Sequence, residues 1–136
     1  MKGFATLAAC LFLVALPALA QSLMAVPSGQ AMVPYEALWE DHVQEDGTRE
    51  TWLILRFLAP EISKIGGRID FAGAEPDLDF LCASVGLPLA RMTGGGVDQI
   101  IVTLLEKPLA RGVRDAHVTK YMSAYRVSGQ TCEWEG

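Results

Sequence analysis

The first twenty residues constrain the fold most, because they determine the compartment in which the chain folds and therefore the chemistry of its cysteines. Lys2 gives a short positive start, residues 4–16 form an almost unbroken apolar run, and Ala18-Leu19-Ala20 presents small residues where signal peptidase reads them. We expect a signal peptide over residues 1–20, cleaved between Ala20 and Gln21. The mature protein is therefore expected to be periplasmic or secreted.

The same N-terminal run also bears on membrane attachment. Its length of about a dozen residues is too short to cross a hydrocarbon core of roughly 30 Å, and no later window is long or apolar enough, so we expect no membrane span. The alternative is a lipoprotein box at residues 7–10, with Cys10 carrying the lipid. That alternative fits poorly, because only residues 4–6 would remain as the apolar segment and the run continues past Cys10.

Size and charge limit the class of protein. Removal of residues 1–20 leaves 116 residues, which suits one compact domain with a core of its own. Lys2 is the only charged residue removed, so the mature chain has 10 basic and 16 acidic residues and a formal net charge of −6. This balance argues against nucleic-acid binding, which depends on many contacts between basic side chains and phosphates.

Two cysteines, Cys82 and Cys132, remain after cleavage. In an oxidising compartment they allow a single intramolecular disulfide, which encloses 49 residues. The chain-entropy relation gives such a bridge about 4 kcal/mol of stabilisation. A reactive thiol is the alternative, but there is no Cys-x-x-Cys spacing and no histidine near either cysteine in sequence.

The mature chain is expected to begin with a leader over residues 21–33, which lies over the domain or stays mobile, and to form a single domain over residues 34–136. Residues 35–43 alternate as a half-buried strand, with Tyr35, Ala37, Trp39 and Val43 on one face. A polar turn with Asp46-Gly47 then leads into a second strand over residues 50–58, which predicts a hairpin. That second strand is apolar on both faces and requires cover on both.

The clearest helix begins near Pro76 and ends at Gly86, which suits a C-terminal cap. Three acidic residues would complement its dipole: Glu75, Asp77 and Asp79. Its apolar stripe runs through Leu78, Leu81, Cys82 and Val85 and places Cys82 on the inward face.

The other segments complete an α+β pattern. Residues 64–71 suggest a weak strand, residues 87–96 a loop, residues 99–105 a central strand, and Asp115 a cap for a short helix beginning at Ala116. The spacing over residues 121–127 fits either a helix or a strand. A last strand is expected over residues 131–134. We therefore predict a mainly antiparallel sheet of about five to six strands, with one principal helix on one face and a second short helix.

Few residues suggest chemistry. Trp39, Trp52, Tyr125 and Trp134 are candidates for a ligand pocket, although aromatic side chains in so small a domain more often form the core. His42 and His117, each beside acidic residues, are weak candidates for a metal or acid–base site.

Other motifs are better explained by structural roles than by binding or catalysis. Thr93-Gly94-Gly95-Gly96 resembles a phosphate loop but is followed by a strand and no lysine, and no serine lies in a nucleophile elbow. Calcium binding by the acidic residues of the helix lacks a suitable loop. We expect no cofactor and no enzymatic activity.

The order of several segments resembles a family of small exported alphaproteobacterial proteins of unknown function. These segments are Trp52 with Arg56-Phe57, Asp77 to Cys82, Asp98 to Val102, Tyr125-Arg126, and Thr131 to Trp134. The resemblance implies a periplasmic domain in which both cysteines belong to the pattern, and it assigns no activity. Some relatives carry an acetolactate-synthase label, which 116 exported residues cannot support, since a thiamine-diphosphate site lies between large α/β domains.

These observations favour a non-enzymatic exported domain that binds a protein partner or an envelope component, through an exposed sheet edge or the loop at residues 94–96. The alternative is a small-ligand-binding protein or minor hydrolase with an aromatic or histidine-containing pocket.

Overall fold

The computed structural model describes residues 23–136, so the predicted signal peptide, its cleavage site and Cys10 lie outside the described residues. Within them, five strands form one sheet in chain order: β1 (Val33–Val43), β2 (Arg49–Leu58), β3 (Gln99–Leu105), β4 (Lys120–Ser128) and β5 (Thr131–Trp134). Neighbouring strands are antiparallel, except that β2 and β3 are parallel. The predicted α+β class with a mainly antiparallel sheet is confirmed.

The predicted hairpin is present as β1 and β2. Its turn is closed by the Gln44 N–H, which donates to the Thr48 carbonyl at 2.8 Å, and by the Asp46 carboxylate, which accepts from the Thr48 N–H at 2.9 Å. Gly47 has a φ of 84°, a left-handed conformation that glycine adopts without steric cost. As expected for a strand with two apolar faces, β2 is buried from Leu53 to Phe57.

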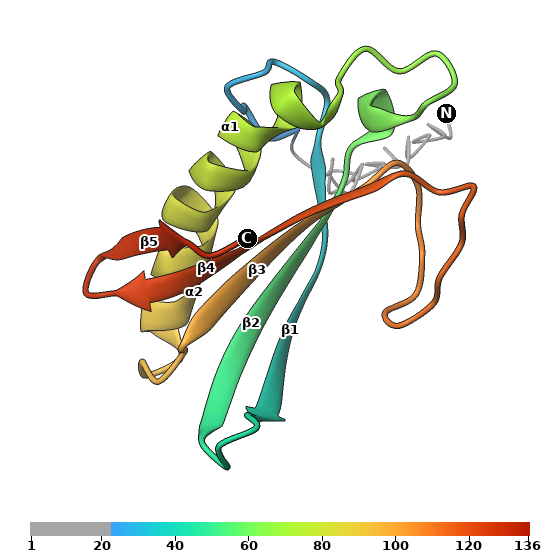
Figure 1. Ribbon diagram of the computed structural model, residues 1–136. Coiled ribbons are helices and arrows are strands. Elements are labelled where there is room, and N and C mark those ends of the chain that lie inside the picture. The colour runs from blue at the N-terminus through green and yellow to red at the C-terminus, as the bar shows by residue number, and fades with distance from the viewer. Residues whose placement is uncertain (1–22) are drawn as a thin grey trace, which may run out of the picture.

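A helical segment over residues 71–92 connects the parallel strands β2 and β3 and covers one face of the sheet (Figure 1). It consists of α1 (Phe71–Leu81), a π-helical turn η2 (Cys82–Gly86) and α2 (Leu87–Met92). The prediction was wrong about both ends. The helix starts after Asp70, whose carboxylate accepts from the Gly73 N–H at 2.9 Å, and it contains Pro76.

Gly86 lies inside this segment rather than capping it, with a helical φ of −64°. A Cβ atom at this position would lie 2.9 Å from Cγ2 of Ile100 on β3. The glycine therefore permits a close approach between helix and sheet, which explains its place in the sequence. Residues 87–92, predicted as part of a loop, continue the helix instead.

The core lies between this helical segment and the sheet. Its members are apolar side chains from the helix-facing side of β2 to β4 and from the inner side of the helix, among them Leu53, Leu55, Phe57, Leu78, Leu81, Ile100, Val102, Leu104 and Tyr125. Residues 99–105 form the middle strand of the five, as predicted.

Three further expectations are settled by the backbone. Residues 64–71 form no strand; a 3₁₀ turn η1 (Pro60–Ile62) and a loop precede the helix instead. No helix begins at Ala116, because the Asp115 carboxylate accepts from the His117 N–H in a local turn. Residues 121–127, which the sequence left open, belong to strand β4.

The segment before β1 contributes to the core, although the sequence placed the start of the domain at residue 34. Val26 and Met32 are buried in the main hydrophobic cluster, and Gln30 is buried as well. Asp77 of α1 is completely buried and accepts hydrogen bonds from the Ser28 N–H at 2.8 Å, the Ser28 hydroxyl at 2.5 Å and the Gln30 Nε2 at 2.6 Å. Asp77 therefore holds this segment against the helix and does not complement the helix dipole.

Cys82 and Cys132 form a disulfide with a Cα–Cα distance of 6.4 Å. The bridge links the helical segment to β5, the last strand of the sheet. Cys82 is buried at the inner face of the helix, where its spacing from Leu78 and Leu81 placed it.

Candidate functional site

A row of polar side chains crosses the sheet on the face opposite the helix. The strand register aligns Glu36 of β1 with Arg56 of β2, Arg56 with Thr103 of β3, and Thr103 with Met122 of β4. Arg56 is only 4% exposed, so its charge requires partners. Its guanidinium donates to the Glu36 carboxylate and to the Leu109 carbonyl.

The loop over residues 106–119 lies on the same face and carries the Leu109 carbonyl. Figure 1 shows this loop, between β3 and β4, on the side of the sheet away from α1. Arg111 fastens it to β1, since its Nε and Nη2 each donate to the Glu40 carboxylate at 3.0 Å. The base of the loop is closed by the Thr119 N–H, which donates to the Glu106 carboxylate at 2.7 Å.

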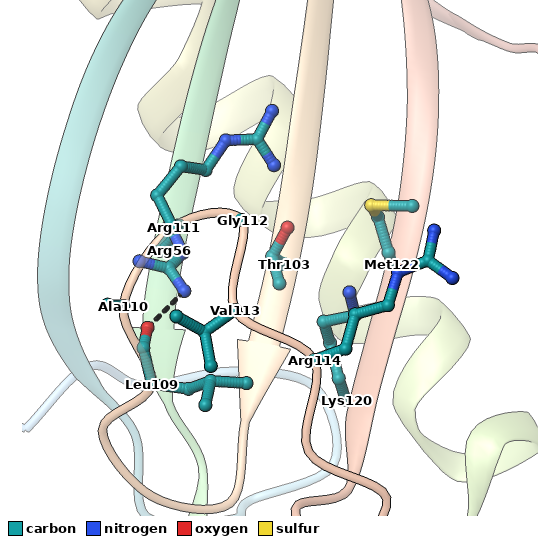
Figure 2. A pocket seen from close by; sticks show the side chains of 10 residues that line it. All are labelled: Arg56, Thr103, Leu109, Ala110, Arg111, Gly112, Val113, Arg114, Lys120 and Met122. Atoms are coloured by element: carbon teal, nitrogen blue, oxygen red, sulfur yellow. Dashed lines mark hydrogen bonds between the residues drawn. The ribbon is translucent and has the colours of Figure 1, made fainter.

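A cavity of about 230 Å³ lies between this loop and the sheet, and we call it the cationic pocket (Figure 2). Its lining consists of Arg56, Thr103, Leu109, Ala110, Arg111, Gly112, Val113, Arg114, Lys120 and Met122. Four of the eleven basic residues of an acidic chain are therefore gathered around one small cavity.

The charges of the pocket are only partly compensated. Glu36 pairs with Arg56 and Glu40 with Arg111, whereas Arg114 and Lys120 form no ion pair within residues 23–136. In Figure 2, Arg114 and Lys120 lie on the β4 side of the pocket, and Arg111 extends away from them. The pocket thus carries an excess of positive charge.

Thr103 adds a neutral donor to these cations. It is 4% exposed, lines the pocket, and its hydroxyl makes no hydrogen bond to a described residue. Guanidinium, ammonium and hydroxyl groups are the donors that bind carboxylate and phosphate oxygens in proteins. The lining contains no carboxylate, so its chemistry suits an anion.

A polar network extends from the pocket along the same face. His42 stacks on Trp52 with ring centroids 3.7 Å apart, and its Nε2 lies 3.0 Å from the Glu40 carboxylate. The Glu50 carboxylate accepts from the Trp52 indole N–H at 3.0 Å and from Arg126 at 3.2 Å. The hydrogen bonds from Arg111, reinforced by His42, lower the pKa of Glu40 from an ordinary value of 4.5 to about 2.

This low pKa makes a testable difference to stability. Because the pKa of Glu40 is lower in the folded than in the unfolded protein, its stabilisation is complete above pH 4.5 and is lost as the pH falls towards 2. We expect Glu40→Gln to lower the free energy of unfolding by about 1 to 2 kcal/mol at pH 7, since partial exposure screens the pair. The difference from the wild type should shrink between pH 4.5 and 2.5 in urea denaturation.

Glu45, exposed in the hairpin turn, provides the matched control. Glu45→Gln should change stability little at any of these pH values. An effect of Glu40→Gln that stays constant down to pH 2.5 would contradict the assigned ion pair.

The aromatic residues predicted as a pocket do not share one cavity. Trp39 is 44% exposed near the outer edge of the helix-facing side, and Trp52 lies on the opposite face of the sheet. Tyr125 is in the core and donates its hydroxyl to the Asp79 carboxylate at 2.6 Å. Only Tyr125 and Trp134 line a common cavity, of about 340 Å³ beside the disulfide.

The two histidines lie at opposite ends of the sheet. His42 pairs with Glu50 near the hairpin turn, whereas the exposed His117 precedes Lys120, which pairs with Leu105 at the far end of β3. The seven residues of β3 separate these ends by roughly 20 Å. Within residues 23–136, no group of three or more histidine, cysteine or acidic side chains is arranged to hold a metal ion.

Sequence reasoning missed the cationic pocket. Its basic residues stand at positions 56, 111, 114 and 120 and come together only through strand register and the return of the loop. One signal was present, since Arg56 interrupts the otherwise apolar run of β2. An arginine in such a strand requires a partner and therefore indicates a polar site on that face.

The described residues thus form a small α+β domain with a pocket of basic side chains on the sheet face opposite the helix, beneath the loop of residues 106–119. By sequence, the chain belongs to a family of unknown function (DUF6497), whose model matches residues 9–136. This agrees with the resemblance to a family without an assigned activity. No curated protein and no solved structure was found to match the chain. No helix among residues 23–136 is long and apolar enough to cross a membrane.

Proposed function

We propose that this protein is an exported, non-enzymatic binding domain that holds an anionic group, a phosphate or a carboxylate of an envelope component or partner, in the cationic pocket. The proposal of export is supported by the signal-peptide pattern of residues 1–20 and by the Cys82–Cys132 disulfide, since disulfides persist in oxidising compartments.

One observation carries the proposed binding function: Arg114 and Lys120 face a small cavity without an acidic partner among the described residues, next to the free hydroxyl of Thr103. Two uncompensated cations beside the paired Arg56 and Arg111 repel one another, and an anion between them would relieve that repulsion. The sequence also suggested binding of a small ligand in an aromatic pocket. The proposal retains a small ligand but places it in the cationic pocket and not among the aromatic residues.

The test is binding of inorganic phosphate and of acetate to oxidised residues 21–136 by calorimetry at low ionic strength, where screening is weak. We expect Arg114→Gln with Lys120→Gln to weaken binding at least about tenfold, since each charged hydrogen bond contributes about 1.5 to 3 kcal/mol. These two substitutions leave the Arg56–Glu36 and Arg111–Glu40 pairs intact.

The control is Lys64→Gln with Arg91→Gln, which removes the same charge from exposed positions outside the pocket. This variant should bind like the wild type. Equal weakening in both double variants, or no binding of either anion to the wild type, would contradict the proposal.

A second candidate is partner binding at the outer edge of β1. This eleven-residue strand has no neighbour on its outer side within residues 23–136. Trp39 and Val43, 44% and 65% exposed, would offer apolar contacts to an added strand. The loop at residues 94–96 is also exposed, but its three glycines offer only backbone groups.

A further inference from the structure

A second cavity, of about 400 Å³, adjoins the cationic pocket beneath the same loop. The two cavities share four lining residues: Leu109, Val113, Arg114 and Lys120. Because four residues border both spaces, a ligand in one lies against the walls of the other. We call the second space the apolar pocket.

The lining of the apolar pocket differs in character from that of its neighbour. Leu109, Val113, Ala116 and Val118 contribute hydrocarbon, and the stems of Arg114 and Lys120 add methylene groups. Asp115 is the one acidic residue in this lining, and its carboxylate accepts from the His117 N–H. Arg56, Arg111 and Thr103 thus line only the cationic pocket, Ala116 and Val118 line only the apolar pocket, and Arg114 and Lys120 border both.

Val113 stands at the junction and is 49% exposed. Figure 2 shows its side chain within the bend of the loop, beside Leu109, and both residues line the two pockets. A ligand with both a charged group and an apolar chain could remove this side chain from water while its charged group meets the cations.

We propose that the two pockets form one composite site for a single-chain amphipathic anion, such as an alkyl phosphate or a fatty-acid carboxylate. The head group lies among Arg56, Thr103, Arg114 and Lys120, and the chain lies against Leu109, Val113 and Val118. This inference rests on the proposed function, because it specifies the class of anion that the cationic pocket binds.

Chain length provides the test. Dissociation constants of residues 21–136 are measured for inorganic phosphate, butyl phosphate, hexyl phosphate and octyl phosphate, and for acetate, hexanoate and octanoate, all below micelle-forming concentrations. If the chain enters the apolar pocket, each added methylene should tighten binding up to about fourfold. The phosphate and carboxylate series show which head group the site prefers.

Val113→Ser separates the contribution of the chain from that of the head group. The substitution removes apolar surface at the junction without a change of charge, and should lower the preference for octyl phosphate over inorganic phosphate, the ratio of their dissociation constants, at least about threefold. Val43→Ser is the control, because Val43 is 65% exposed on β1, outside both pockets. Val43→Ser should bind every ligand like the wild type.

The outcomes distinguish the two proposals. Anion binding that depends on Arg114 and Lys120 but not on chain length would overturn the composite site and leave the anion pocket standing. Binding that tightens with chain length in the wild type and equally in Val113→Ser would place the chain elsewhere and also overturn the composite site. Failure of every anion to bind would overturn both.

Discussion

Replacement of Cys82 or Cys132 by serine is expected to lower the free energy of unfolding by about 4 kcal/mol. The disulfide encloses 49 residues and joins the helical segment to β5, a strand of four residues. Loss of this closure raises the conformational entropy of the unfolded chain, and the expected cost is comparable with the whole stability of a small domain. Guanidinium denaturation under non-reducing conditions measures it.

Each single substitution removes the same bridge, so the two should destabilise the protein equally. The double variant Cys82→Ser, Cys132→Ser should be no less stable than either single variant, because only one interaction is lost. Clearly unequal effects of the single variants, or additive effects in the double variant, would show that the two sulfur atoms act separately.

The second large effect is expected for Asp77→Ala, which should cost about 3 kcal/mol. Asp77 is completely buried and accepts three hydrogen bonds from Ser28 and Gln30. Its removal leaves buried donors without partners and frees the segment that places Met32 in the core. Thermal unfolding should show the loss, and proteolysis should become faster in residues 24–32.

Glu75→Ala is the matched control, because Glu75 is an exposed acidic residue two positions earlier on the same helix. It should change stability by no more than about 0.5 kcal/mol. If Glu75→Ala and Asp77→Ala destabilised the protein to the same extent, the effect would come from helix electrostatics and not from the hydrogen bonds to Ser28 and Gln30.

The parts of the fold that depend on local patterns were predictable. The hairpin followed from alternation around Asp46-Gly47, the central strand from its continuous apolar run, and the disulfide from the cysteine count. Neighbouring residues carry the information for the hairpin and the central strand, whereas the disulfide follows because two cysteines allow only one pairing.

The residues at which the helical segment begins and ends depend on contacts with residues that are distant in sequence. Proline favours the first turn and glycine the end of a helix, yet Pro76 and Gly86 both lie inside the helical segment. Packing against Ile100 determines the place of Gly86, and nothing near Gly86 in the sequence indicates that contact. Residues 23–32 likewise reach the core through contacts that are distant in sequence, among them the hydrogen bond from Ser28 to Asp77, about fifty residues later.

The candidate site was hidden for a similar reason. Arg56 on β2 and Lys120 on β4 line the same cavity because both strands pair with β3. Arg114 lines it as well because the loop that carries it folds back over the sheet. No sequence window holds this group of charges together. The sequence instead suggested aromatic and histidine sites, whose members the fold places on different faces or at opposite ends of the sheet.

The most direct test of the central claim is to map where an anion binds. Phosphate is titrated into isotope-labelled, oxidised residues 21–136, and backbone amide resonances are followed by nuclear magnetic resonance. We predict saturable shifts at Thr103, residues 109–114 and Lys120, with no change along α1 or β5. Shifts confined to the cavity beside Trp134, or scattered over the surface without saturation, would contradict the cationic pocket.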